Sequence, residues 1–190
     1  DGLICGTFGY YDLHLGYLRD VIGRREGVSN VYAMNVVMLG DRNLFIADTY
    51  VNPDPSAEQL AEMTLLAAEE VRRFGLTPKV ALLSNSSFGT VQSPGAGKMC
   101  EALAMIQQAD PTLEIDGEMQ GDTAWDEGLR KRMFPNTTLH GRPNLFVLPN
   151  LDAANIGYNL VRVMTEGVAI GPILMGLDQP AHILTPASSP

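Results

Sequence analysis

The chain is poor in the residue types that support metal and redox chemistry. It has two cysteines, Cys5 and Cys100, and three histidines, His14, His140 and His182, which are far apart in the sequence. None of these spacings matches a zinc-binding pattern or a Cys-x-x-Cys redox motif. We therefore expect both cysteines to be reduced and structural, in a cytoplasmic protein.

Positive charge is also scarce. The chain has 13 Lys and Arg against 22 Asp and Glu, which gives a formal net charge of −9. Binding to DNA or RNA relies on basic patches, so this balance argues against a nucleic-acid partner, although a locally positive site for a small anion remains open. The sequence has no apolar run of about 18 residues and no signal peptide, so we expect no membrane partner.

Internal repeats, low-complexity tracts and long linkers are absent, so we expect the 190 residues to form one domain. The hydrophobic content of 45% and charged content of 18% are typical of a globular protein. The chain starts with DGLICG, which is typical of a strand interior, and it does not start with Met. We expect it to be a piece of a longer protein.

Short apolar runs alternate with amphipathic segments, and this alternation predicts an α/β fold with a mainly parallel sheet. The sheet should be mixed, because Gly40 and Asp41 join two apolar runs as a hairpin turn would. We expect strands at 3–5, 31–39, 44–47, 80–83, 113–116, 145–148 and 182–184, and helices at 11–22, 55–74, 96–108, 122–133 and 152–165.

Helix 55–74 carries the strongest pattern. Asp54 can cap it, and Pro55 suits its first turn. Its predicted core face consists of Leu60, Thr64, Ala67, Val71 and Phe74, which recur at helical spacing.

In open α/β sheets, ligands bind beyond the carboxyl ends of the strands. The loop 84–98 follows such a strand and offers the run Ser84, Asn85, Ser86 and Ser87, whose polar groups, with the glycines of the loop, suit an oxyanion. The run Gly-Ala-Gly-Lys at 95–98 lacks the spacing of a nucleotide phosphate loop. The alternative interpretation is a polar connection between a strand and a helix.

Carboxylates crowd the end of the strand at 113–116. Asp116 and Glu118 are candidates for a metal site or a general base. The alternative is a solvated turn in which Asp122 caps the next helix.

A further loop, 149–160, begins a helix that either Asn150 or Asp152 can cap. Helix N-termini favour anions, so Asn155 and Tyr158 are candidates to contact a ligand there. The alternative is packing in the core, which the helical spacing predicts for Ile156, Leu160 and Val163.

The chain resembles the phosphate acetyl/butyryl transferase family over nearly the whole of residues 1–190. The resemblance rests on the stretches FIADTYVNPDPSAEQLAEM, KVALLSNSS, DGEMQGD, PNLDAANIGYNL and AIGPILMGLDQP. It implies a three-layer α/β/α architecture like that of isocitrate and isopropylmalate dehydrogenases, and a cleft that receives coenzyme A.

One branch is more similar, namely the phosphotransacetylase-like domain of multidomain NADP-dependent malic enzymes. The matching stretches are GTFGYYDLHLGYLRDVIG, LLAAEEVRRFG and HILTP. The resemblance implies a preceding malic enzyme domain that converts malate to pyruvate with NADP and a divalent metal, Mg or Mn. It implies no cofactor in this fragment, acetyl-CoA as a regulatory ligand, and association into a homodimer or larger homo-oligomer.

The sequence departs from the transferase pattern in two loops. Thr185, Pro186 and Ala187 stand where active transferases have Ser-Arg-Gly, and GYYDLHL replaces Thr-Thr-Ala-Asp. Proline offers neither charge nor an N–H to a developing anion. We therefore predict a non-catalytic acetyl-CoA-binding domain, with an active phosphate acetyltransferase or a structural oligomerisation module as alternatives. The predicted ligand-binding residues are Ser84, Asn85, Ser86, Ser87, Asp116, Glu118, Asn155, Tyr158, Thr185 and Ser188.

Overall fold

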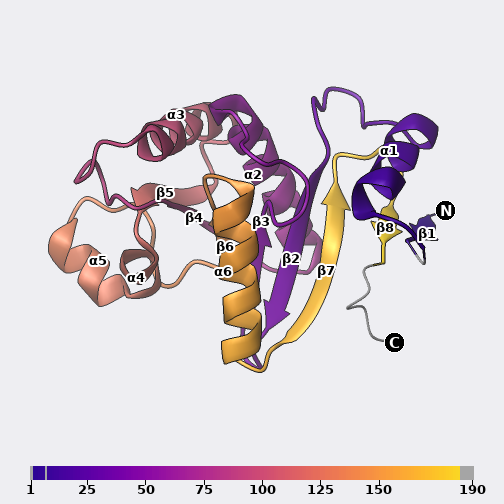
Figure 1. The fold of residues 1–190 in the computed structure, drawn as a ribbon. Helices are drawn as coiled ribbons and strands as arrows, with labels where there is room; N and C mark the ends of the chain where they lie inside the picture. Colours follow the sequence, from indigo (N-terminus) through magenta and orange to yellow (C-terminus); the bar gives the residue numbers. More distant parts are fainter. Residues whose placement is uncertain (1, 7, 185–190) are drawn as a thin grey trace.

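The computed structural model describes residues 2–6 and 8–184 and contains two sheets flanked by helices (Figure 1). In chain order the elements are β1 (Leu3–Cys5), α1 (Tyr11–Val21), β2 (Tyr32–Met38), β3 (Asn43–Ala47), α2 (Ala57–Arg73), β4 (Lys79–Leu83), α3 (Pro94–Ala109), β5 (Glu114–Met119), α4 (Gly121–Trp125), α5 (Glu127–Met133), β6 (Leu145–Val147), α6 (Leu151–Met164), β7 (Val168–Met175) and β8 (Ala181–Ile183).

The main sheet has six strands in the order β5-β4-β6-β3-β2-β7. The first four strands are mutually parallel, and β2 runs antiparallel to both β3 and β7. The predicted hairpin joins β2 to β3. Leu39 N donates to Arg42 O at 2.8 Å, and Gly40 has φ +64°. The mixed, mainly parallel α/β sheet is therefore confirmed.

Strand β7 was not predicted. Gly171 and Pro172 interrupt its apolar run, which makes the segment look like a turn. The structure places it at the edge of the sheet, where a missing N–H is tolerated. Its pairing with β2 shifts register beside these residues, between Met34 and Val36. A Cβ on Gly171 would lie 2.7 Å from the side chain of Asn35, so β2 leaves no room for a side chain there.

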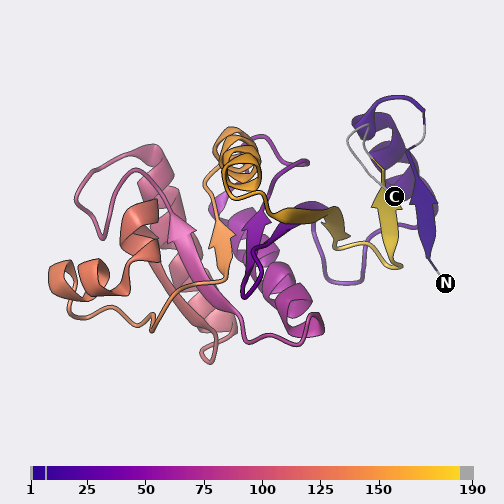
Figure 2. The same cartoon turned by 90° about the horizontal axis from the view of Figure 1, so that it is seen from below.

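Helices cover both faces of the main sheet and complete the predicted three layers (Figure 2). On one face, α2 and α3 bury a core that includes Leu60, Met99 and Phe45. On the other face, α4 and α6 pack against the sheet through Ala124 and Tyr158. The ligand-binding edge predicted for such a fold therefore lies between two helix layers.

Two predicted helix caps were wrong. Ser56 caps α2 in a capping box with Gln59, and Asp54 lies outside the helix. The hydroxyl of Ser56 reaches the third helical N–H, and Gln59 returns a bond to the cap backbone, so both orphan donors are satisfied. Asp122 caps nothing, because it already lies in the first turn of α4.

The predicted helix 122–133 is two short helices. Asp126 ends α4 with extended backbone, and its Oδ1 accepts the Leu129 N–H at 2.9 Å as the cap of α5. Arg130 holds the two helices together. It is fully buried and donates to the carbonyls of Thr123, Ala124, Leu139 and Gly141 at 2.6–3.2 Å.

A smaller unit, formed by β1, β8 and α1, lies beside β7 (Figure 1). Strands β1 and β8 form a parallel pair, and α1 packs Leu15 and Leu18 against Ala181 and Ile183 of β8. We call these three elements the β1–β8 unit.

The outer face of α6 is apolar and exposed. Ile156, Leu160 and Val163 are 60%, 56% and 72% exposed, so the alternative interpretation, that they pack in the core, was wrong. The helix buries its opposite face through Ala154 and Tyr158.

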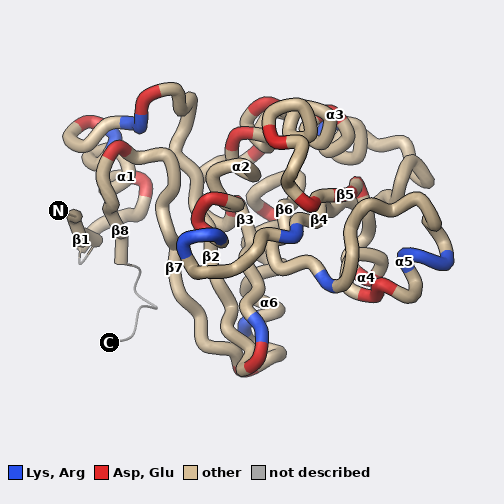
Figure 3. Tube along the Cα trace, turned by 180° about the vertical axis from the view of Figure 1, so that it is seen from behind, with Lys and Arg blue, Asp and Glu red and all other residues tan. Residues whose placement is uncertain are grey.

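Lys and Arg are scattered among acidic residues along the trace (Figure 3). Within residues 2–6 and 8–184, no helix has the length and apolar character needed to cross a membrane.

Candidate functional site

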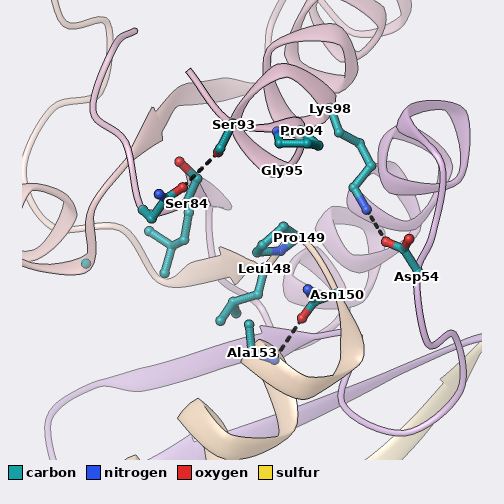
Figure 4. Close-up of a pocket in the computed structure, with 13 residues that line it drawn as sticks. Asp54, Ser84, Ser93, Pro94, Gly95, Lys98, Leu148, Pro149, Asn150 and Ala153 are labelled. Carbon is teal, nitrogen blue, oxygen red and sulfur yellow. Dashed lines mark hydrogen bonds and ion pairs between the residues drawn. The ribbon is translucent and has the colours of Figure 1, made fainter. Parts of the chain in front are cut away.

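The carboxyl ends of β4 and β6 open into a cavity of about 670 Å³, which we call the site cavity (Figure 4). Its position is where parallel sheets bind ligands. Its walls come from the loops after these strands, the first turns of α3 and α6, and Asp54. The lining residues are Asp54, Leu83, Ser84, Asn85, Ser93, Pro94, Gly95, Lys98, Gly121, Leu148, Pro149, Asn150 and Ala153.

Two helix N-termini meet at the site cavity. Ser93 caps α3, and its Oγ accepts the Ala96 N–H at 3.2 Å. Asn150 caps α6, and its Oδ1 accepts the Ala153 N–H at 2.9 Å. Each cap satisfies one donor.

Few other first-turn donors are free. Pro94 has no N–H, and the Leu151 N–H donates to Pro53 O at 3.1 Å, so the Gly95 and Asp152 N–H groups remain. These two groups and the helix dipoles favour a negative or carbonyl oxygen nearby.

The loop after β4 brings two predicted site residues to this cavity, Ser84 and Asn85. Ser84 Oγ accepts the Ser86 N–H at 2.9 Å, which fixes the turn. Asn85 is exposed, and its Oδ1 accepts the Ser93 hydroxyl at 2.9 Å. Its Nδ2 has no hydrogen-bond partner among the described residues, so this amide can donate to a ligand.

One ion pair bounds the site cavity on the α2 side. Lys98 Nζ, on α3, lies 2.5 Å from Asp54 Oδ1, and the Lys98 side chain is only 19% exposed (Figure 4). The carboxylate balances the ammonium charge. An anion that enters the cavity must therefore compete with Asp54 for Lys98.

The other two serines of the run are buried beneath the loop. Ser86 Oγ accepts the Val91 N–H at 3.0 Å, and Ser87 Oγ accepts the Gln120 N–H at 3.0 Å. These bonds shape the loop that presents Ser84 and Asn85. Direct ligand contact by Ser86 and Ser87 stays a prediction.

The two predicted carboxylates of β5 are buried and lie outside the site cavity. Asp116 Oδ2 accepts the Thr137 hydroxyl at 2.6 Å and the Thr138 N–H at 2.8 Å. It therefore ties the loop after α5 to the sheet.

Glu118 lines a separate cavity of about 410 Å³. Its Oε1 accepts the Gly89 N–H at 3.1 Å, and its Oε2 accepts from the Cys100 thiol at 3.6 Å. Partial burial and the neighbouring Glu118 charge raise the pKa of Cys100, which favours the protonated thiol.

The remaining predicted residues lie away from the site cavity or outside the described residues. Asn155 Nδ2 donates to Thr49 O at 3.1 Å, and Tyr158 is buried between α6 and the sheet. Thr185 and Ser188, together with Pro186, lie outside the described residues. Ligand contacts by these residues stay predictions.

Sequence reasoning did not list Ser93, Lys98 and Asn150 as ligand contacts. A signal existed for the helix start, because Ser-Pro at 93–94 is typical of a cap followed by the first helical residue. The pairing of Lys98 with Asp54 had no signal, because 44 residues separate them. Within the part of the chain that the structure describes, no group of three His, Cys, Asp or Glu side chains is placed to hold a metal ion.

Comparison with known proteins gives consistent matches across the chain. The family model described as phosphate acetyl/butaryl transferase matches residues 1–190. The chain is 51% identical over 190 residues to the NADP-dependent malic enzyme of Escherichia coli (strain K12), covering 100% of this chain and 25% of that protein. The solved structure of the EutD phosphotransacetylase from Staphylococcus aureus aligns with a TM-score of 0.91 and 34% identity, and that of a phosphotransacetylase from Streptococcus pyogenes with 0.94 and 31%. Both alignments cover 100% of this chain and 58% of the solved chain.

Proposed function

The chain belongs to the phosphate acetyl/butaryl transferase family, and on this premise we propose that it is a regulatory, non-catalytic acetyl-CoA-binding domain. The observation that carries the proposal is Pro186, which stands in the loop where the resemblance implies a catalytic arginine. An arginine stabilises negative charge that develops during acyl transfer, and removing one such donor typically costs about a hundredfold or more in rate. Among the described residues that line the site cavity, none is an arginine or a histidine.

The polar donors of the site cavity support the proposed binding. Asn85 offers a free amide donor, and the first turns of α3 and α6 offer N–H groups. These donors suit the carbonyl and phosphate oxygens of an acyl-CoA. The single described cation of the cavity, Lys98, is already paired with Asp54, so little positive charge is left to drive a transfer step.

The regulated activity would belong to another part of the protein. The chain spans a quarter of the length of the malic enzymes that it matches. We propose that a preceding malic enzyme domain converts malate to pyruvate, with NADP and Mg or Mn, and that acetyl-CoA bound to this domain inhibits that reaction. Such coupling requires that acetyl-CoA bind two states of the assembly with different affinity.

The test uses the full-length protein and its malate decarboxylation rate. Added acetyl-CoA should lower the rate, and deletion of residues 1–190 of this chain should abolish that response. Asn85→Ala should weaken acetyl-CoA binding by about fivefold to tenfold, as expected for one lost hydrogen bond. Asn159→Ala is the matched control, because Asn159 is an exposed amide on α6 outside the site cavity. Inhibition that persists after the deletion would refute the regulatory role.

An active transferase is the alternative that the family itself suggests. It predicts that the protein forms acetyl-CoA from acetyl phosphate and CoA. Rapid turnover in that assay would overturn the non-catalytic proposal, whereas the absence of turnover with measurable acetyl-CoA binding would support it.

A structural role in self-association has its own supporting observation. The exposed apolar residues Ile156, Leu160 and Val163 form one face of α6, and such faces typically mark interfaces. A homodimer built on this face is compatible with acetyl-CoA binding, and Leu160→Glu followed by sedimentation analysis tests it. An unchanged oligomeric state would show that α6 is not the interface.

A further inference from the structure

We infer that the chain holds a second ligand site, which binds a medium-chain carboxylic acid such as decanoate. The alkyl chain of this ligand lies in an apolar slot beneath α6, and its carboxylate lies beside Arg42 and Arg142. The site is separate from the proposed binding of acetyl-CoA and does not depend on it. Its two parts are an apolar space that suits a hydrocarbon and an adjoining cavity with an unbalanced positive charge.

The hydrocarbon part of the site is a slot of about 340 Å³ between α6, α4 and the main sheet. Its walls are almost wholly apolar, and Ile46 of β3 and Phe146 of β6 contribute the sheet side. The one hydroxyl among its described lining residues, that of Thr165, already donates to Val161 O at 2.6 Å. Methylene groups placed in the slot leave water without leaving a polar group of the wall unpaired. The slot therefore suits a hydrocarbon chain.

The length of the slot sets the length of the chain. Gly157 and Val161 of α6, and Thr165 at its C-terminal end, line the slot at intervals of four residues. Eight residue steps of helix span roughly 12 Å. An extended alkyl chain advances roughly 1.3 Å per carbon, so roughly nine or ten carbons fill this distance.

A glycine keeps the inner end of the slot open. A Cβ on Gly157 would first meet the side chain of Leu148, at 3.7 Å, and Leu148 also lines the site cavity. Glycine inside a helix lowers helix stability relative to alanine, and here it leaves space beneath α6. Gly157 therefore marks the end of the slot where the tail of the ligand lies.

The charged part of the site is a cavity of about 380 Å³ at the opposite end. Leu44 and Trp125 line both this cavity and the slot, so the two spaces adjoin. The guanidinium groups of Arg42 and Arg142 lie 5.8 Å and 5.0 Å from the centre of the Trp125 ring. Stacking on an aromatic ring orders a guanidinium and leaves its N–H edge available to a carboxylate.

The charges that line this cavity favour a single negative charge on the ligand. Arg42 makes two 3.1 Å contacts with the Asp41 carboxylate, whereas Arg142 has no carboxylate partner among the described residues. Asp41 is the one acidic residue among the described lining residues. Two guanidinium groups against one carboxylate leave one positive charge unbalanced. A monocarboxylate balances this charge, and a doubly charged phosphate exceeds it.

Two substitutions test the two parts of the site. Arg142→Gln removes the unbalanced charge, and its matched control is Arg132→Gln on the exposed side of α5. Gly157→Leu fills the tail end of the slot, and leucine is a better helix former than glycine, so α6 should still fold. Its matched control is Gly16→Leu in α1, where a Cβ meets no atom within 4 Å.

The experiment is calorimetric titration of the full-length protein with straight-chain carboxylates from hexanoate to dodecanoate. The affinity should rise roughly fourfold for each added methylene and should stop rising near decanoate, where the slot is full. The alcohol 1-decanol has a similar tail without the charge. It should bind about fivefold to tenfold more weakly than decanoate, as expected for a charged contact that is partly screened by water.

The variants should respond differently to these ligands. Arg142→Gln should lower the affinity for decanoate about fivefold to tenfold and leave that for 1-decanol unchanged, because only the charged contact is lost. Gly157→Leu should lower the affinity for decanoate about tenfold or more and leave that for hexanoate nearly unchanged, because the shorter tail ends before Gly157. Retained hexanoate binding also shows that this variant is folded.

Three results would overturn the inference. Saturable binding of decanoate that neither Arg142→Gln nor Gly157→Leu weakens would show nonspecific uptake by exposed apolar residues. Equal affinities for decanoate and 1-decanol would remove the arginines from the site. An unsubstituted protein that binds none of the carboxylates would leave no site at all. None of these results affects the acetyl-CoA proposal, which fails only if acetyl-CoA itself does not bind or does not inhibit.

Discussion

The main sheet and the β1–β8 unit differ in how completely their strands are covered. In β2, the residues from Tyr32 to Val37 are all buried, because helices cover both faces of the main sheet and the strands β3 and β7 flank β2. In β1, Leu3 and Ile4 are 42% and 68% exposed, and α1 covers one side alone. Parallel strands are normally buried on both faces, and a two-stranded sheet is only marginally stable by itself. The comparison teaches that packing from helices, rather than strand pairing, decides how firmly each sheet is held.

This difference predicts that stability is unevenly distributed along the chain. Local opening requires the least free energy where few apolar contacts are lost. We expect the main sheet to unfold as one cooperative unit and the β1–β8 unit to open before it.

The largest effect should follow removal of Arg130, which lies on the α4–α5 side of the main sheet. Arg130→Ala would leave four carbonyls without their donor, three of them buried and that of Gly141 half-buried, because the guanidinium is fully buried. We expect a loss of about 3–5 kcal/mol in the free energy of unfolding, measured by urea denaturation. Arg132→Ala, an exposed neighbour, should change it by less than about 0.5 kcal/mol. Equal stabilities of the two variants would contradict this role of Arg130.

A core truncation tests the comparison between the two sheets directly. Leu82 of β4 is fully buried, so Leu82→Ala should lower the free energy of unfolding by about 2–5 kcal/mol. Ile4→Ala in β1 removes a similar volume from an exposed side chain, and about 0.5 kcal/mol or less should be lost. Chemical denaturation of both variants measures the contrast. Similar losses would show that β1 is covered as fully as β4.

Leu18 allows a test of local opening within the β1–β8 unit. This side chain is 1% exposed and packs α1 onto β8. Leu18→Ala should speed amide hydrogen exchange of α1 by about tenfold or more and leave β4 amides nearly unchanged. Equal acceleration in β4 would show that the two units unfold together.

The smallest effect concerns the pH dependence of α5. Lys131 at 2.6 Å and the Gly141 N–H hold the pKa of Glu127 at about 2, below its ordinary value of 4.5. The carboxylate therefore contributes stability above pH 4.5, and this contribution is lost as the pH falls toward 2. Glu127→Gln should flatten the stability curve between pH 4.5 and 2, as followed by thermal unfolding. An unchanged slope would mean that other groups dominate acid unfolding.

Much of the fold was predictable because local patterns and burial agree. Leu60, Thr64, Ala67 and Val71 recur at helical spacing and are all fully buried in the structure. Phe74, at the end of the same pattern, is 42% exposed, yet its ring packs edge-on against Phe45 at 5.3 Å between ring centres. Periodicity therefore identified the buried face of α2 and was wrong only at Phe74, which caps the end of the helix.

The wrong predictions have a common cause, because the local sequence fits two structures equally well and does not choose between them. Ile156, Leu160 and Val163 follow helical spacing as well as the buried residues do, and the sequence does not show which apolar face of α6 meets the sheet. Gly171 and Pro172 look like a turn in isolation, and they are tolerated in β7 because that strand lies at the edge of the sheet.

The same limit applies to the candidate site. The serine and asparagine run at 84–87 was recognisable, because polar loops after buried strands mark the binding edge of a parallel sheet. The structure divides that run into two parts. Asn85 lines the site cavity, while Ser86 and Ser87 are buried and hold the loop.

The sequence by itself determined the alternation of strands and helices, the hairpin at Gly40 and the end of the sheet where the site cavity opens. These features depend on spacing, caps and turn residues within a few positions of one another. Only the tertiary structure decided that Lys98 pairs with Asp54, that Arg130 is buried among carbonyls, and that Arg142 lies beside Trp125. Such contacts join residues that the chain separates, and packing of whole elements chooses among the many pairings that the sequence permits.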